Sequence, residues 1–138
     1  MHFKAYGYQD RAAGTPMGTD AIFQLASMVL GTKTVAWMTS DHLGPNIRNQ
    51  VAAIEPHRDG YSCGLGVAVR MHDGMAATPG STGDFTWNGA NGTLFWVDPQ
   101  ERLVVVVGTA APGEIRKYYR EQMGALVYGA MTELRRPK

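Results

Sequence analysis

The feature that most constrains this chain is an unbroken apolar run, Leu103–Val107. Such a run of mainly β-branched residues predicts a strand that is covered on both faces. A second run of strand formers, Thr93–Val97, precedes it, and Asp98–Glu101 separates the two by a length that suits a hairpin. Phe85–Trp87 begins a third strand. Three adjacent antiparallel strands are the minimum for a stable sheet, so the rest of the chain must cover this one.

Two helices are expected to provide that cover. The longer one runs from about Glu114 to Leu134, because apolar and aromatic residues recur there at helical spacing: Ile115, Tyr118, Tyr119, Gln122, Leu126, Val127, Ala130 and Leu134. The shorter one covers Thr32–Leu43 and ends at Gly44-Pro45. The sequence therefore predicts an α+β fold, in which an antiparallel β-sheet packs against a long C-terminal helix and a shorter central helix.

Two further strands are predicted outside the central block. Phe3–Tyr8 alternates and is expected to be an edge strand. Tyr61–Met71 is expected to be one strand, because Leu65, Val67, Val69 and Met71 alternate on one face. Asn46–Gly60 is expected to be a loop with at most one helical turn. No internal repeat or linker divides the chain, so residues 1–138 are predicted to form a single domain.

Composition excludes several functional classes. The net charge of +1 gives no basic field for nucleic acid, and no apolar run reaches the ~20 residues that span a bilayer. Cys63 is the only cysteine and the start lacks a signal-peptide apolar region, so a cytoplasmic location is expected. No metal and no cofactor are expected, because the four histidines lack metal-ligand spacing and each is predicted to be a surface or loop residue: His2, His42, His57 and His72.

Several segments together resemble a known group of enzymes. YGYQDRAAGTPMGTDAIFQLASM, KTVAWMTSDHLGP, GLGVAVR and PGSTGDFTWNGANGTLFWVDPQERLVVVV are similar to segments of the serine hydrolases related to class C β-lactamases, the family VIII carboxylesterases in particular. The resemblance covers nearly all of the chain. Full-length relatives have well over a hundred residues in a helical subdomain, which here shrink to about Val29–Thr32.

The resemblance implies an acyl-transfer site. Ser27 stands at the position of the acylated nucleophile, and Ala90 would offer a backbone N–H to the oxyanion, together with the N–H of Ser27. Trp87-Asn88-Gly89 matches the strand motif that lines the substrate cleft, with Asn88 in place of a small residue. Ser27 read without the resemblance is a helix cap or a loop serine.

Both bases of the related enzymes are missing. Leu30 occupies the position of the lysine of their Ser-x-x-Lys motif, and their Tyr-x-Asn motif has no counterpart. Lys33, six residues after Ser27, is a candidate substitute base if the shortened connection folds it back.

Two functions remain open from the sequence. One is weak hydrolysis of small esters or β-lactam amides through an acyl-Ser27 intermediate. The other is a non-catalytic domain that acts as an oligomeric or ligand-binding fold. In both cases loss of the helical subdomain exposes apolar surface, so a homodimer or higher homo-oligomer is expected.

Overall fold

The computed structural model describes residues 30–47, 51–53 and 55–132. Ser27 and the predicted strand Phe3–Tyr8 lie outside these residues. The described elements, in chain order, are helix α2 (Thr32–Met38), the 3-10 turns η1 (Val51–Ala53) and η2 (Pro56–Arg58), strands β1 (Tyr61–Cys63), β2 (Ala68–Arg70), β3 (Phe85–Asn88), β4 (Leu94–Asp98) and β5 (Leu103–Val107), and helix α3 (Ile115–Gly129). The prediction of an α+β fold is confirmed.

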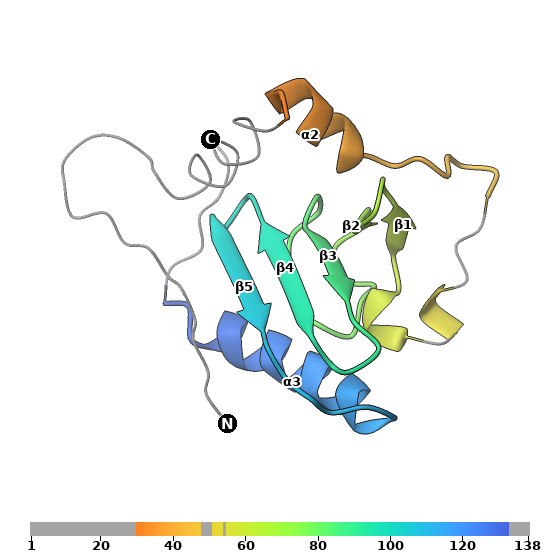
Figure 1. Ribbon diagram of the computed structural model, residues 1–138. Helices are drawn as coiled ribbons and strands as arrows, with labels where there is room; N and C mark the ends of the chain where they lie inside the picture. Colours follow the sequence, from red (N-terminus) through yellow and green to blue (C-terminus); the bar gives the residue numbers. More distant parts are fainter. Residues whose placement is uncertain (1–29, 48–50, 54, 133–138) are drawn as a thin grey trace.

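The five strands form one antiparallel sheet in the order β1-β2-β3-β4-β5 (Figure 1). The three predicted central strands pair as expected, with Trp87 opposite Phe95 and Phe95 opposite Val106. The β4–β5 hairpin is closed by Asp98, whose Oδ1 accepts the N–H groups of Gln100 and Glu101, each at 3.1 Å. A carboxylate that bonds the backbone two and three residues on is a usual way to fix such a turn.

The prediction of one strand over Tyr61–Met71 is wrong, because this segment folds into two strands. Residues 61–63 pair with residues 68–70, and the N–H of Gly64 donates to the carbonyl of Val67 at 2.8 Å to close the turn. Gly66 adopts a φ of 79°, which glycine enters without a steric penalty. The alternating pattern is therefore interrupted by a reversal that the two glycines permit.

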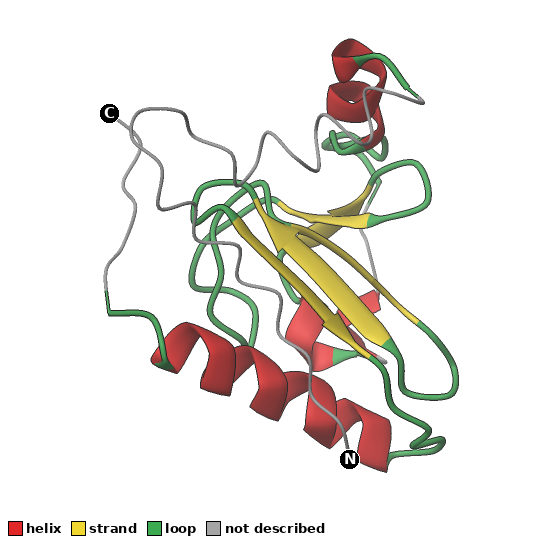
Figure 2. Ribbon diagram, turned by 60° about the vertical axis from the view of Figure 1, so that its left-hand side comes forward, coloured by secondary structure: helices red, strands yellow, loops and turns green. Residues whose placement is uncertain are grey.

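Helix α3 covers one face of the sheet (Figures 1 and 2). The core cluster there contains Leu94, Trp96, Val105 and Val107, against which Leu103, Met123, Val127 and Tyr128 pack. The predicted apolar stripe of this helix is largely wrong: Ile115, Tyr118 and Leu126 are 51%, 59% and 64% exposed, whereas Arg120 and Gly124 are buried. The buried face is turned by about one residue, since Gly124 lets the helix approach Thr78 closely.

Helix α2 lies on the opposite side of the sheet from α3 (Figures 1 and 2). It buries Val35 alone, and Trp37 remains 61% exposed. Its end is tied to the β1–β2 hairpin, because the carbonyl of Met38 accepts the N–H of Leu65 at 2.9 Å. The helix is shorter than predicted: the hydroxyl of Ser40 donates to the carbonyl of Trp37 at 2.6 Å, which favours a turn over further helix.

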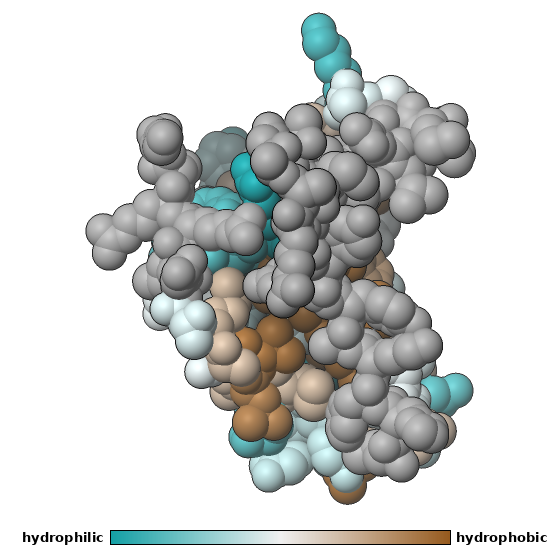
Figure 3. Space-filling view, turned by 90° about the vertical axis from the view of Figure 1, so that its left-hand side faces the viewer, coloured by the Kyte–Doolittle hydropathy of each residue, from teal (hydrophilic) through white to brown (hydrophobic). Residues whose placement is uncertain are grey.

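The sequence predicts that β5 is covered on both faces, but among the described residues only one of its faces is packed against a helix. Val105 and Val107 are buried against α3, but Val106 between them is 61% exposed. The side of the molecule on which β5 lies carries apolar surface, seen in brown in Figure 3. Among the described residues, no helix has the length and apolar character needed to cross a bilayer.

Candidate active site

The predicted cleft motif lies where β3 ends and turns into β4. Gly89 continues the pairing beyond Asn88, since its N–H donates to the carbonyl of Thr93 at 2.9 Å. The N–H of Gly92 then donates to the carbonyl of Gly89 at 3.0 Å, which closes a four-residue turn. Gly92 has a φ of 102°, and a side chain there would press on Thr109 Oγ1 at 2.7 Å. The turn 89–92 is therefore tightly built and requires glycine at its end.

An open hollow of about 390 Å³ lies beside this turn, on the face of the sheet away from α3. Trp87, Phe95 and Val106 form its floor as one row across three strands, and Asn88 and Gly89 are among its other lining residues. Its volume lies within the range of small-molecule sites. Three apolar side chains in register suit an apolar acyl chain or ring.

Of the four neighbouring residues that the sequence predicts for the cleft, Trp87, Asn88 and Gly89 line this hollow, and Ala90 directly follows them in the turn. Trp87 is 45% exposed and stacks under the guanidinium of Arg58, at 4.8 Å from the ring centroid. Asn88 points the other way, toward α3, where its Nδ2 donates to Oε2 of Glu55 at 3.0 Å. Asn88 therefore helps to hold the site in place from behind, whereas the side chain of Trp87 forms part of the open surface of the hollow.

Four successive carbonyls of the turn 89–92 are held from outside the turn. Two donors are side chains of α3: Arg120 Nη2 donates to the carbonyl of Gly89 at 2.7 Å, and Arg116 Nη1 to that of Ala90 at 3.3 Å. The other two come from the segment before α3: the N–H of Ala111 donates to the carbonyl of Asn91 at 2.8 Å, and Thr109 Oγ1 to that of Gly92 at 2.9 Å. In the described part of the chain, the N–H groups of Ala90 and Asn91 donate to no acceptor.

Glu55 is the centre of the supporting cluster, and the sequence reasoning missed it. Besides the bond from Asn88, its Oε1 accepts from Nη1 of Arg120 at 3.1 Å, and its Oε2 lies 3.2 Å from Nε of Arg58. Burial opposes its ionisation, but the bond from Asn88 and the charges of Arg58 and Arg120 outweigh burial and lower the pKa of Glu55. No local pattern signals these partners, because Glu55 and Arg120 are 65 residues apart in sequence.

His57 is buried beside this cluster, which corrects the prediction of a surface or loop histidine. It is 7% exposed, and burial lowers its pKa to about 4. Neither ring nitrogen has a hydrogen-bond partner among the described residues, and Nε2 lies 3.8 Å from Oε2 of Glu55. His57 is therefore neutral at pH 7. No group of three or more metal-ligand side chains forms a cation site in the described ranges.

The structure does not test the remaining predicted site residues together. Ser27 lies outside the described residues. Lys33 is an exposed residue of α2, and no hydrogen bond or ion pair of the described residues involves it. Leu30 is 39% exposed. The role of Lys33 as a substitute base stays a prediction.

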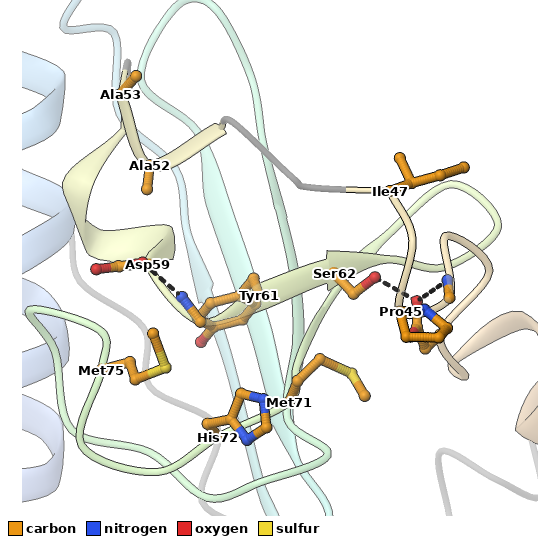
Figure 4. A pocket seen from close by; sticks show the side chains of 13 residues that line it. Pro45, Ile47, Ala52, Ala53, Asp59, Tyr61, Ser62, Met71, His72 and Met75 are labelled. Atoms are coloured by element: carbon orange, nitrogen blue, oxygen red, sulfur yellow. Dashed lines mark hydrogen bonds between the residues drawn. The ribbon is translucent and has the colours of Figure 1, made fainter.

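A larger hollow, of about 760 Å³, lies beside β1 and holds none of the predicted site residues (Figure 4). Its lining includes Tyr61, Met71 and Met75, and the hydroxyl of Ser62 donates to Oδ1 of Asp41 at its edge. None of the residues to which the resemblance assigns a catalytic role lines this hollow. The smaller hollow at the end of β3 is the better candidate for an active site.

The sheet and its helices form part of a β-lactamase-like fold, as a comparison with solved structures shows. EstCE1, described as a hydrolase with promiscuous acyltransferase activity, superposes with a TM-score of 0.60 at 29% sequence identity, covering 80% of this chain and 29% of its own. Unliganded simvastatin synthase (LovD) from Aspergillus terreus superposes with a TM-score of 0.63 at 15% identity, covering 80% and 32%. Its LovD6 mutant gives a TM-score of 0.62 at 17% identity.

The likeness is one of structure over part of these proteins. This chain spans about a third of the length of each matched structure, with 32% of LovD and 29% of EstCE1 covered. No family model matches the sequence. No curated protein sequence matches it either.

Proposed function

We propose that this chain hydrolyses small esters through an acyl-Ser27 intermediate. The observation that carries the proposal is the N–H of Ala90, which donates to no acceptor among the described residues and follows Gly89 at the rim of the apolar hollow of Trp87, Phe95 and Val106. A backbone N–H at the end of this strand is a donor suited to the oxyanion of a tetrahedral intermediate. The description of EstCE1 as a hydrolase supports the same class of reaction.

In the proposed reaction the hydroxyl of Ser27 attacks the ester carbonyl, and its proton passes to a base and then to the departing alkoxide. Water next attacks acyl-Ser27, which releases the carboxylic acid and restores the hydroxyl. The N–H groups of Ala90 and Ser27 hold the oxyanion in both steps. Lys33 is the proposed base. Because Leu30 stands where related enzymes have lysine, turnover is expected to be slow by orders of magnitude.

Hydrolysis of p-nitrophenyl acetate and of a chromogenic cephalosporin tests this proposal. The rates are compared for the unaltered chain, Ser27→Ala, Lys33→Met and, as a matched control, Ser40→Ala, which removes an exposed serine of the segment after α2. Loss of hydrolysis in Ser27→Ala but not in Ser40→Ala supports the proposal. Equal rates in all four proteins reject it.

A non-catalytic oligomeric fold is the second candidate. It is favoured by β5, whose outer edge pairs with no strand in the described residues and whose Val106 is 61% exposed. An open apolar edge strand is a ready template for another copy of the chain. Analytical ultracentrifugation of the unaltered chain and of Val106→Lys tests it, with Ala77→Lys in an exposed loop as the control. A dimer that only Val106→Lys dissociates supports this candidate, and a monomer at high concentration rejects it.

A further inference from the structure

We infer that Arg120 is a positioning residue of the candidate active site, which directs the N–H of Ala90 toward a bound oxyanion. The role of that N–H rests on the proposed function. The inference starts from two observations: Nη2 of Arg120 donates to the carbonyl of Gly89 at 2.7 Å, and the residue is 3% exposed. Arginine is rarely buried this deeply unless its charge has partners, so the contacts of Arg120 are expected to have a specific role.

The geometry of the peptide bond links Arg120 to Ala90. No described peptide bond is cis, and in a planar trans peptide the N–H points opposite to the preceding C=O. Holding the carbonyl of Gly89 toward α3 therefore turns the N–H of Ala90 away from α3, to the side on which the hollow opens. The carbonyl of Ala90 is held in the same way by Arg116, which turns the N–H of Asn91.

The two arginines act from one ridge of α3. Residues four apart lie on the same face of a helix, so Arg116 and Arg120 reach two successive carbonyls of the turn. A charged donor also polarises the peptide that it bonds, which strengthens the opposite N–H as a donor. Arg120 thus contributes both direction and strength to the N–H of Ala90 without touching a substrate.

Glu55 fixes Arg120 in turn. Its Oε1 accepts from Nη1 of the guanidinium at 3.1 Å, while its Oε2 accepts from Asn88, the last residue of β3. The carboxylate therefore ties α3 to the strand that carries the site. The charged and titratable groups around Arg120 are Glu55, Arg58, His57 and Arg116.

The turn has a second bond that lets it survive the loss of Arg120. The carbonyl of Gly89 also accepts the N–H of Gly92 at 3.0 Å. Removal of the guanidinium is thus expected to free the orientation of the 89–90 peptide rather than to unfold the hairpin. This separates a positioning role from a merely structural one.

Residual dipolar couplings of backbone N–H vectors, measured by NMR on the full chain, test the inference without any activity. In Arg120→Met the coupling of Ala90 is expected to change, while those of Trp87 and Phe95 stay within error; Arg120→Lys, with one ammonium in place of the fork, is expected to restore part of the change. Lys117→Met, which removes an exposed ion pair with Glu114, is the control. If Arg120→Met unfolds, Glu55→Gln serves instead, since it loosens the guanidinium with little change of shape.

Kinetics give a second readout. If the chain has Ser27-dependent esterase activity, Arg120→Met is expected to lower kcat about tenfold with KM within about twofold, because an oxyanion donor acts in the transition state. An unchanged coupling of Ala90 in a folded Arg120→Met protein, or an unchanged kcat, would overturn the inference. Should the unaltered chain show no Ser27-dependent turnover, the proposed function fails, and the couplings still decide whether Arg120 orients Ala90.

Discussion

Nε of Arg70 lies 2.7 Å from Oδ2 of Asp84 in the protein interior, where the two side chains are 1% and 2% exposed. The same guanidinium donates through Nη2 to the carbonyls of Thr78 and Pro79, at 3.2 and 3.1 Å, and the hydroxyl of Tyr61 donates to Oδ1 of Asp84 at 2.6 Å. This network joins β1, β2 and the long loop that leads to β3. The loop after β2 is therefore fixed to the sheet by charge rather than by apolar packing.

Replacing one member of this pair is expected to leave a buried charge without its partner. Asp84→Asn should lower the free energy of unfolding by about 3–5 kcal/mol. Urea unfolding measures the loss. The control is Lys117→Met, which breaks a pair with the exposed Glu114 and should change stability far less. If Asp84→Asn lowers the free energy of unfolding as little as Lys117→Met does, the ion pair does not hold the loop to the sheet.

Gly64 is expected to be irreplaceable at the β1–β2 turn. A Cβ at this position would overlap the carbonyl oxygen of Met38, a backbone atom that accepts the N–H of Leu65. Since α2 must shift to make room, Gly64→Ala should cost about 2 kcal/mol or more, within the range of overpacked sites. Thermal unfolding of Gly64→Ala and of Gly108→Ala, where a Cβ meets open space, provides the comparison. Equal melting temperatures for the two variants would contradict the contact between α2 and the hairpin.

Burial of neutral His57 predicts a pH dependence of stability. Its folded-state pKa of about 4 lies below the ordinary 6.5, so between pH 6.5 and 4 the unfolded chain binds a proton that the folded chain does not. The free energy of unfolding therefore falls as the pH is lowered through this window, by about 3 kcal/mol in total. His57→Gln should remove this loss, measured by urea unfolding at pH 7 and pH 4.5.

The comparison of the two proteins isolates His57. Asp84, whose pKa burial raises to about 6, is present in both and cancels from the difference. His72→Gln, in an exposed position, should behave as the unaltered chain does. An identical pH dependence for His57→Gln and the unaltered chain would show that His57 is protonated or exposed in solution.

The row formed by Trp87, Phe95 and Val106 predicts a preference for longer acyl chains. Each buried methylene contributes about 0.8 kcal/mol, so p-nitrophenyl butyrate should exceed the acetate in kcat/KM by about tenfold. Val106→Asp should reduce this ratio toward one, whereas Ala125→Asp on the exposed side of α3 should not. A ratio that Val106→Asp leaves intact would place the acyl chain elsewhere.

The strands could be predicted where the local sequence pattern matches the position of the segment in the folded sheet. The apolar run Leu103–Val107 and the β-formers before it identified β4 and β5 within one residue, and the turn residues between them identified the hairpin. The break at Gly64 to Gly66 was missed because a reversal inside an alternating segment leaves the alternation visible. The general fold could thus be predicted, and the exact strand count could not.

The face of α3 was mispredicted for a physical reason. Apolar periodicity assumes that the buried side of a helix is apolar, but α3 buries Arg120, whose Nη1 and Nη2 bond Glu55 and the carbonyl of Gly89. These partners are distant in sequence, so no local signal reveals them. The sequence pointed to Trp87-Asn88-Gly89 and Ala90 as a candidate site, which stays a prediction, whereas the charged residues that support this turn were found only in the structure.

Covalent labelling of Ser27 is the most direct test of the proposed acyl-enzyme chemistry. The chain is incubated with an alkyl fluorophosphonate, and its intact mass and tryptic peptides are measured beside those of Ser27→Ala and Ser40→Ala. The account predicts one adduct per chain, on the peptide that contains Ser27, in the unaltered protein and in Ser40→Ala, and none in Ser27→Ala. An unlabelled wild-type chain, or a label that persists in Ser27→Ala, would contradict it.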